Sequence, residues 1–299
     1  MTLILSLPSK TFLAGEYAVL AGGPALVLNT RPRFELRVQR GSGEIRGLPP
    51  EAPAWKWIEA RRPLLEKFSL DFHDPHGGQG GFGASGAQFI LFHCLTTFLQ
   101  RSFERMLAGP DLRDIWNDYQ VLSGGRGSGA DILALIAGRV AVVDVSAQEA
   151  STRDWPYPEL GFSVIRTHRK VATHEHLETL ERQSLSILVR PAQKCKEAFG
   201  SAPAEVFVSQ LKNFAATLRE LDLQTSSTLN LVDRLQGEDW CLLAKGCGAL
   251  GADTVLVLYP IETHEQAQAY LRKQSLSVVA FHADINPGLD IKWSWSPCH

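Results

Sequence analysis

A run of glycines between residues 76 and 86 leads directly into an apolar stretch, residues 89–99, that has helical length. Within this region, residues 80–87 read GGFGASGA. Glycine lets backbone amides approach an anion closely, and a helix that begins beside such a loop directs the positive end of its dipole at the anion. The pattern predicts a phosphate-binding loop, although the same composition is also typical of a flexible connector.

One hydroxyl lies at the end of this loop. Ser85 occupies the turn into the predicted helix, where it can cap the helix or bind a magnesium ion that is itself bound to phosphate. No Gly-Lys-Ser/Thr sequence follows, and the glycine spacing differs from a clean dinucleotide-binding fingerprint. The loop therefore belongs to neither of these two common nucleotide-binding motifs.

Three further segments carry residues that could act together with this loop. Asp131 follows a second glycine cluster, residues 123–129, and begins another predicted helix, residues 130–137. Its carboxylate could act on a substrate, or it could simply favour the positive end of the helix. Lys10 is compatible with an ordinary surface lysine, and residues 245–253, which read KGCGALGAD, are compatible with a turn between strands.

The elements that must position these residues alternate between strands and helices in both halves of the chain. Strands are predicted at residues 3–7, 34–38, 140–145, 162–166 and 254–259, and helices at residues 55–68, 89–99, 130–137, 174–183, 204–221 and 264–274. Residues 155–158 form a natural boundary between the halves. The sequence therefore predicts an α+β protein of two lobes, residues 1–155 and 156–299.

The composition is that of an ordinary globular protein of 299 residues. Lys and Arg (30) nearly balance Asp and Glu (32), so no overall field favours nucleic acid or an anionic membrane, and phosphate recognition must be local. The cysteines lack paired CxxC spacing, which favours a reducing cytoplasm. Arg139 and Asp144 interrupt the best candidate membrane span, and the N-terminus lacks the basic region of a signal peptide, so we expect a soluble, cytoplasmic protein.

Taken together and in order, these segments resemble the motifs of the GHMP kinases, a family that includes galactokinase, homoserine kinase, mevalonate kinase and phosphomevalonate kinase. Residues 8–20, PSKTFLAGEYAVL, resemble the first motif, with GEY in place of GEH. Residues 81–87 are similar to the second motif, GLGSSAA, and residues 245–253 to the third, KxxGAGGGD. GEY and the final aspartate of the third motif, Asp253, favour phosphomevalonate kinases. The resemblance covers nearly the whole chain.

The resemblance implies the GHMP fold, with an N-terminal lobe that binds nucleotide phosphates and a ferredoxin-like C-terminal lobe that closes the acceptor site. It implies a phosphotransferase that uses ATP and Mg²⁺ and converts phosphomevalonate to diphosphomevalonate on the mevalonate route to isoprenoids. Alternatives are mevalonate, a sugar or homoserine as the acceptor, a mevalonate diphosphate decarboxylase, and an inactive nucleotide-binding protein of the same fold. We expect a monomer or homodimer, with no nucleic-acid or membrane partner.

The resemblance also implies roles for individual residues. Ser128-Gly129-Ala130-Asp131 matches the family's SGxD, which places Asp131 in the catalytic position, while Lys10 offsets charge on the transferred group and Ser85 binds magnesium. A phosphorylated acceptor also needs cations, because two phosphates must approach each other. The nucleotide is expected to contact Gly80, Gly81, Gly83, Ala84, Ser85, Gly86 and Ala87. The acceptor is expected to contact Lys10, Glu16, Tyr17, Arg126, Ser128, Lys170, Thr173, His174, Gly248 and Ala249.

Four positions depart from the family pattern. Ala84 replaces the first serine of the second motif, and Leu250 and Ala252 replace two glycines of the third. Gln120 stands where mevalonate kinases carry a magnesium-binding glutamate, and an amide is a poor ligand for a hard cation. We therefore expect either a differently held metal, with Asp118 as a candidate ligand, or a site that works without that carboxylate.

Overall fold

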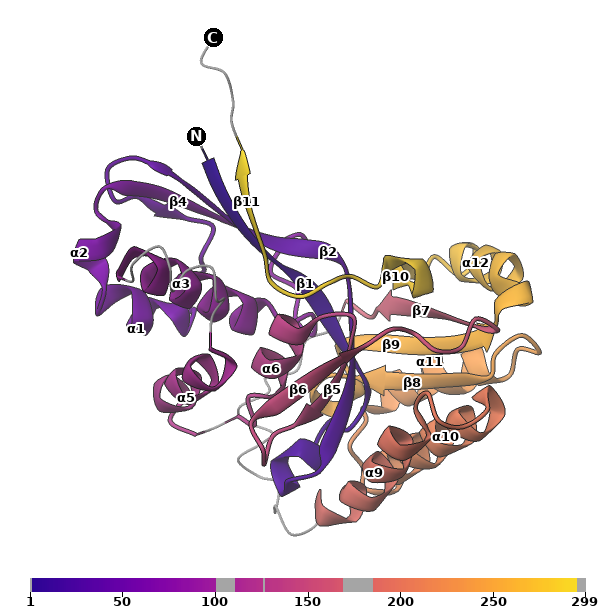
Figure 1. The fold of residues 1–299 in the computed structure, drawn as a ribbon. Coiled ribbons are helices and arrows are strands. Elements are labelled where there is room, and N and C mark those ends of the chain that lie inside the picture. Colours follow the sequence, from indigo (N-terminus) through magenta and orange to yellow (C-terminus); the bar gives the residue numbers. More distant parts are fainter. Residues whose placement is uncertain (1, 101–110, 126, 169–184, 295–299) are drawn as a thin grey trace.

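The computed structural model describes residues 2–100, 111–125, 127–168 and 185–294. Two β-sheets, each with helices packed against it, form two lobes that lie side by side (Figure 1). The expected α+β architecture of two lobes is therefore confirmed. Within the described residues, every helix is too short or too polar to cross a lipid bilayer.

The first sheet is built on two long antiparallel strands, β1 (Thr2–Ala14) and β2 (Pro24–Arg40). Its main path is β11-β1-β2-β4-β3, and β5 pairs with the beginning of β2 and with β6. Pro8 pairs with Arg33 and Ser9 with Thr30, so Arg31 and Pro32 of β2 form a bulge opposite β1, just before Lys10. The other strands are β3 (Ile45–Arg46), β4 (Phe68–His73), β5 (Val140–Asp144), β6 (Glu149–Arg153) and β11 (Asp290–Ser294).

Helix α3 (Ala84–Gln100) lies in the core of the first lobe, and its residues 86–96 are buried without a break. A helix that is apolar on all sides has to be covered on all sides, and α3 contacts β1, β2, α1, α5 and α6. The helix predicted over residues 55–68 is instead two short helices followed by β4, with Pro63 in the first turn of the second. The smaller helices are η1 (Ala18–Ala21), α1 (Ala54–Glu59), α2 (Arg62–Leu65), α5 (Leu112–Ser123) and α6 (Ala130–Ala137).

The second sheet has the strand order β10-β7-β9-β8, and each neighbouring pair is antiparallel. Among the described residues, helices lie between β7 and β8 along the chain and again between β9 and β10, which is the ferredoxin-like arrangement. The strands are β7 (Leu160–Arg166), β8 (Leu243–Cys247), β9 (Thr254–Pro260) and β10 (Ser277–Phe281). The helices are η2 (Ser186–Leu188), α9 (Val189–Ala198), α10 (Ala204–Glu220), α11 (Ser226–Gln236), η3 (Ala249–Gly251), η4 (Ile261–Thr263), α12 (His264–Lys273) and η5 (His282–Asp284).

The chain passes from one sheet to the other close to the predicted boundary, because β6 ends at Arg153 and β7 begins at Leu160. Strand β11, however, follows the second sheet in sequence and pairs with β1 in the first. The first lobe therefore includes residues from the far end of the described chain (Figure 1). A division into residues 1–155 and 156–299 stays a prediction.

Candidate functional site

A cavity of about 440 Å³ lies where the three sequence motifs meet. Its volume falls within the range of small-molecule sites, which is about 300 to 1,000 Å³. The walls come from β1, the glycine loop and the start of α3, the end of α5, the start of α6, and the loop after β8. The predicted site residues that line it are Lys10, Glu16, Tyr17, Gly80, Gly81, Gly83, Ala84, Ser85, Gly86, Ser128, Asp131, Gly248 and Ala249.

Five predicted site residues are not among the described residues that line this cavity. Ala87 is fully buried, and its amide donates to the Gly83 carbonyl at 2.9 Å. That amide is used inside α3, so it is not available to a phosphate. Arg126, Lys170, Thr173 and His174 lie outside the described residues.

The glycine loop is fixed between β1 and the third motif. The Lys10 amide donates to the Phe82 carbonyl at 2.9 Å, which ties the loop to β1. Gly81 and Gly83 have φ values of +91° and +94°, a region that favours glycine. A Cβ on Gly81 would lie 2.3 Å from Cβ of Asp253, so only glycine allows this contact. The loop therefore reaches α3 in one defined path, with the helix N-terminus at the cavity.

Asp131 and Ser85 lie on the same wall of the cavity, each in the first turn of a helix. A Cβ on Gly86 would lie 3.2 Å from Oδ2 of Asp131, so the starts of α3 and α6 are in close contact. The charge of Asp131 and then burial raise the pKa of Tyr119, which lines the cavity as a neutral phenol. Tyr119 was not identified from the sequence, because an aromatic residue at this helical position resembles any core aromatic.

Helix α5 supports the second glycine cluster through side-chain donors. Trp116 Nε1 donates to the Ser128 carbonyl at 3.2 Å, and Gln120 Nε2 donates to the Gly127 carbonyl at 3.1 Å. Gly129 has a φ of +70°, and a Cβ there would lie 2.4 Å from Trp116 Nε1. Because a glutamate cannot donate to a carbonyl, the amide of Gln120 suits this position. Gln120 thus shapes the loop that precedes Asp131 and is not among the lining residues.

The third motif adopts the path of a glycine loop although it carries two substitutions. Leu250 has left-handed backbone angles (φ 50°, ψ 30°), a conformation that glycine adopts at lower cost. Its amide donates to the hydroxyl of Tyr17 at 2.7 Å, which joins the third motif to the first. Burial raises the pKa of Tyr17 to about 12, opposed by that amide and assisted by Glu16 and Asp253. Tyr17 is therefore a neutral acceptor at ordinary pH.

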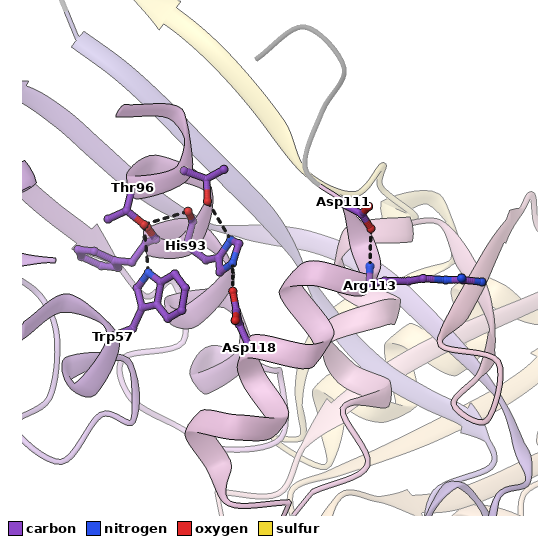
Figure 2. Close-up of polar contacts among 8 residues, drawn as sticks. Trp57, His93, Thr96, Asp111, Arg113 and Asp118 are labelled. Atoms are coloured by element: carbon purple, nitrogen blue, oxygen red, sulfur yellow. Dashed lines mark hydrogen bonds and ion pairs between the residues drawn. The ribbon is translucent and has the colours of Figure 1, made fainter. Parts of the chain in front are cut away.

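Asp118, the alternative metal ligand, is bound to a histidine. Figure 2 shows its carboxylate directed at His93 of α3, with 2.9 Å between Oδ2 and Nε2. His93 is buried and stacks on Trp57, with ring centroids 4.6 Å apart. Burial lowers the pKa of His93, and Asp118 partly offsets this effect. Asp118 connects α5 to α3 and is not among the residues that line the cavity.

The donor set in the cavity fits a magnesium ion that is shared with phosphates. Within the described part of the chain, no group of three His, Cys, Asp or Glu side chains could hold a metal by itself. Mg²⁺ commonly takes one or two protein ligands and fills its other positions with substrate phosphates and water. Ser85 and Asp131 supply a hydroxyl and a carboxylate on one wall of the cavity, which matches that requirement.

His76 connects the glycine loop to both sheets. Ser9 donates to the Pro32 carbonyl at 2.6 Å, so it accepts from Nε2 of His76, which lies 2.6 Å from it. Nδ1 of His76 then accepts from Arg166 of β7 at 2.9 Å. The imidazole stacks on Phe82 of the glycine loop, with centroids 3.9 Å apart. None of these partners was identified from the sequence.

We expect the His76 contacts to make the fold sensitive to acid. Burial and then Arg166, against the opposing charge of Asp74, lower the pKa of His76 to about 4 from 6.5. Because the pKa of His76 is lower in the folded state, the unfolded chain takes up a proton first as pH falls. The free energy of unfolding is therefore unaffected above pH 6.5 and decreases as pH falls towards 4, by up to about 3 kcal/mol. Urea unfolding at several pH values should give a shallower pH dependence for His76→Gln than for the wild type.

The matched control is His73→Gln, which changes an exposed histidine on β4. It should keep the wild-type dependence of unfolding free energy on pH. If His76→Gln kept it too, the neutral His76 would not be the source of the acid sensitivity.

Comparison with protein-family models finds no match, and comparison of the sequence with curated proteins finds none either. Solved structures do match. A Lin0012 protein from Listeria innocua has a TM-score of 0.75 at 18% identity, covering 98% of this chain and 100% of its own. Streptococcus pneumoniae phosphomevalonate kinase, in complex with phosphomevalonate and AMPPNP, has a TM-score of 0.72 at 17% identity, covering 93% and 98%. Lactococcus lactis galactokinase complexed with galactose has a TM-score of 0.73 at 12% identity, covering 97% and 95%.

Identities this low show a shared fold and leave the activity to be argued from the site. The matches extend over almost the full lengths of this chain and of these structures, so the whole two-lobed fold is shared. This chain has the GHMP kinase fold.

Proposed function

We propose that this chain is an ATP-dependent kinase of a small molecule, and that its acceptor is phosphomevalonate. One observation carries the proposal: Lys10, Ser85 and Asp131, which come from three distant segments, line one cavity together with the N-terminus of α3. Phosphoryl transfer needs little covalent chemistry from the protein, and catalysis rests on positioning and charge neutralisation. An ammonium, a hydroxyl, a carboxylate and a set of free amides are suited to both tasks.

In the proposed reaction an acceptor oxygen attacks the γ-phosphorus of ATP, the bond to the bridging oxygen breaks, and ADP leaves. The glycine loop and the first amides of α3 bind the phosphates. Lys10 offsets the charge on the transferred group, and Asp131 orients the acceptor. A hydroxyl acceptor would give its proton to Asp131, whereas a phosphate acceptor, with a second pKa near 6, is largely ionised already.

Magnesium would be held by Ser85, with Asp131 beside it, and would neutralise charge on the β- and γ-phosphates. Asp131 can thus act on the acceptor from a wall that it shares with the metal ligand. Gln120 is engaged with Gly127, so the proposed site works without a carboxylate at position 120.

Two features of the first and third motifs support phosphomevalonate as the acceptor. Tyr17 and Asp253, the residues that favour this member of the family, lie close enough for the charge of Asp253 to raise the pKa of Tyr17. The similar structures include a phosphomevalonate kinase bound to phosphomevalonate. Glu16, Tyr17, Ser128, Gly248 and Ala249, together with Arg126, Lys170, Thr173 and His174, are the proposed acceptor contacts. A cytoplasmic monomer or homodimer stays a prediction.

The test is a panel of acceptors. Purified protein, ATP and Mg²⁺ are incubated with phosphomevalonate, mevalonate, galactose or homoserine, and ADP release and product mass are measured. The proposal expects the highest kcat/KM with phosphomevalonate. Preference for another acceptor would correct the substrate, and carbon dioxide release from diphosphomevalonate would indicate a decarboxylase. Binding of ATP without turnover of any acceptor would indicate an inactive nucleotide-binding protein.

Ser85→Ala is expected to lower kcat by about 100-fold, because it removes the hydroxyl proposed to hold the metal where charge develops, a contact worth about 3 kcal/mol. Steady-state kinetics at varied Mg²⁺ should also show a higher magnesium requirement. Ser146→Ala, at an exposed turn between β5 and β6, is the matched control and should remain within about two-fold of the wild type. An unchanged magnesium requirement in Ser85→Ala would argue against metal binding by Ser85.

A further inference from the structure

A second cavity, of about 340 Å³, lies in the second lobe between α11 and the facing ends of β7 and β10. Arg166 and His168 line it from the end of β7, and Ser227 and Arg234 line it from α11. Hydroxyl groups make up much of the rest of the wall, and no carboxylate belongs to the described residues that line the cavity. Its chemistry is that of an anion site.

The two arginines are not neutralised by neighbouring acids. Neither Arg166 nor Arg234 forms an ion pair with another described residue. Asp233, next to Arg234, is bound at both oxygens by Arg219, at 2.6 and 3.0 Å. Nε of Arg166 is buried without a hydrogen-bond partner among the described residues, and leaving a buried donor unpaired costs free energy.

Helix α11 contributes positive charge to the cavity at two positions. Ser227 lies in the first turn of this helix, near the positive end of its dipole, and Arg234 lies on the same face seven residues later. Seven residues correspond to about 10 Å along an α-helix. Positive potential is therefore present at two separate points along the wall of the cavity.

We propose that this second cavity binds a small molecule through a phosphate or diphosphate group. Arginine and hydroxyl donors at a helix N-terminus favour phosphate oxygens. The cavity is separate from the one that contains Lys10 and Asp131, and none of the described residues lines both. Its binding test does not depend on the proposed kinase activity.

Residues that line the second cavity form hydrogen bonds to loops that line the first cavity. Thr228 donates to the Gly251 carbonyl at 3.2 Å, and Thr167 donates to the Asp253 carbonyl at 2.9 Å. Arg166 reaches the glycine loop through His76, which stacks on Phe82. An anion that repositions Arg166 or the start of α11 would therefore shift the glycine loop and the loop of the third motif. Both loops line the first cavity, so such a shift would couple the two cavities.

Pyrophosphate and inorganic phosphate, titrated separately into the protein by calorimetry without Mg²⁺, test the site. Arg234→Gln and Ser227→Asp should each raise the pyrophosphate Kd at least ten-fold. Ser227→Asp places a carboxylate in the first turn of α11, where the dipole favours it, so the fold should tolerate the change. Arg190→Gln, at an exposed position on α9, is the matched control and should leave Kd unchanged.

Binding that is absent in the wild type, or equal in all of these variants, would overturn the proposal. Binding that is lost in Lys10→Met but kept in Arg234→Gln would place the anion in the first cavity and would also overturn it. Tighter binding of pyrophosphate than of phosphate would identify a diphosphate group as the preferred ligand, and the reverse order would identify a single phosphate.

The coupling has its own measurement, and this part rests on the proposed nucleotide site. The Kd of AMPPNP with Mg²⁺ should change at least about five-fold when the second cavity is saturated with the better of the two probes, and Arg234→Gln should abolish the change. Equal AMPPNP affinities with and without the probe would contradict the coupling. Absence of AMPPNP binding would contradict the proposed function while the calorimetric result for the second cavity remains valid.

Discussion

Asp131→Asn is expected to lower kcat for the preferred acceptor by about 10²- to 10⁴-fold, the range associated with a positioned acid or base. The residue lines the cavity in the first turn of α6, against the start of α3, where it can orient the acceptor towards the γ-phosphate. Asparagine keeps the shape of the side chain and removes its charge. Single-turnover measurements should locate the loss in the chemical step, with ATP still bound.

The control separates this role from a simple preference of acids for helix N-termini. Asp114 also lies in the first turn of a helix, α5, and is exposed outside the cavity. Asp114→Asn removes the same dipole interaction, worth about 0.3 to 1 kcal/mol, and should leave kcat unchanged. Near-normal turnover in Asp131→Asn would refute the proposed role, and the carboxylate would then serve the helix alone.

Sequence reasoning is most informative where the candidate site is built from short contiguous segments. The loop at residues 80–87 and Asp131 are local patterns, because a glycine turn and the start of the helix that follows it are consecutive along the chain. The strands predicted at residues 162–166 and 254–259 correspond to β7 and β9, and the helices at residues 204–221 and 264–274 to α10 and α12. The helix predicted at residues 174–183 lies outside the described residues.

Contacts between residues far apart in the chain could not be predicted from the sequence, for a physical reason. His76 lies 67 residues from Ser9 and 90 residues from Arg166, and no spacing rule in a single sequence joins such partners. The same holds for Tyr119 on α5, because only the folded structure brings its side chain close to Asp131. That Gln120 is a poor metal ligand stays a prediction, and its hydrogen bond to Gly127 becomes visible only in three dimensions.

Lys245→Met is expected to cost about 3 to 5 kcal/mol in free energy of unfolding. The ammonium of Lys245 is fully buried and pairs with Glu16, a residue of the first motif, so one ion pair joins β8 to the loop after β1. It also donates to the Phe12 carbonyl at 3.3 Å and lies 3.4 Å from Sγ of Cys247. Burial lowers the pKa of Lys245, but Cys247 and Glu16 more than offset this, and its pKa is raised overall.

Removing one partner leaves the other as an uncompensated buried charge, which explains why the expected cost is large. Glu16→Gln should therefore destabilise the fold to a similar degree, and the double variant should recover part of the loss. Urea unfolding of the four proteins gives the coupling energy directly. If the pair contributed nothing to stability, the decreases in free energy of unfolding of the two single variants would simply add in the double variant.

The pair between Arg219 and Asp233 is the matched control, because it has comparable hydrogen bonding but is about half exposed on both sides. Arg219→Met should destabilise the fold far less than Lys245→Met, since water screens an exposed pair. A cost for Lys245→Met as small as that of Arg219→Met would mean that the buried pair does not hold the lobes together. A large cost, with recovery in the double variant, would show that the first and third motifs depend on each other for their positions at the cavity.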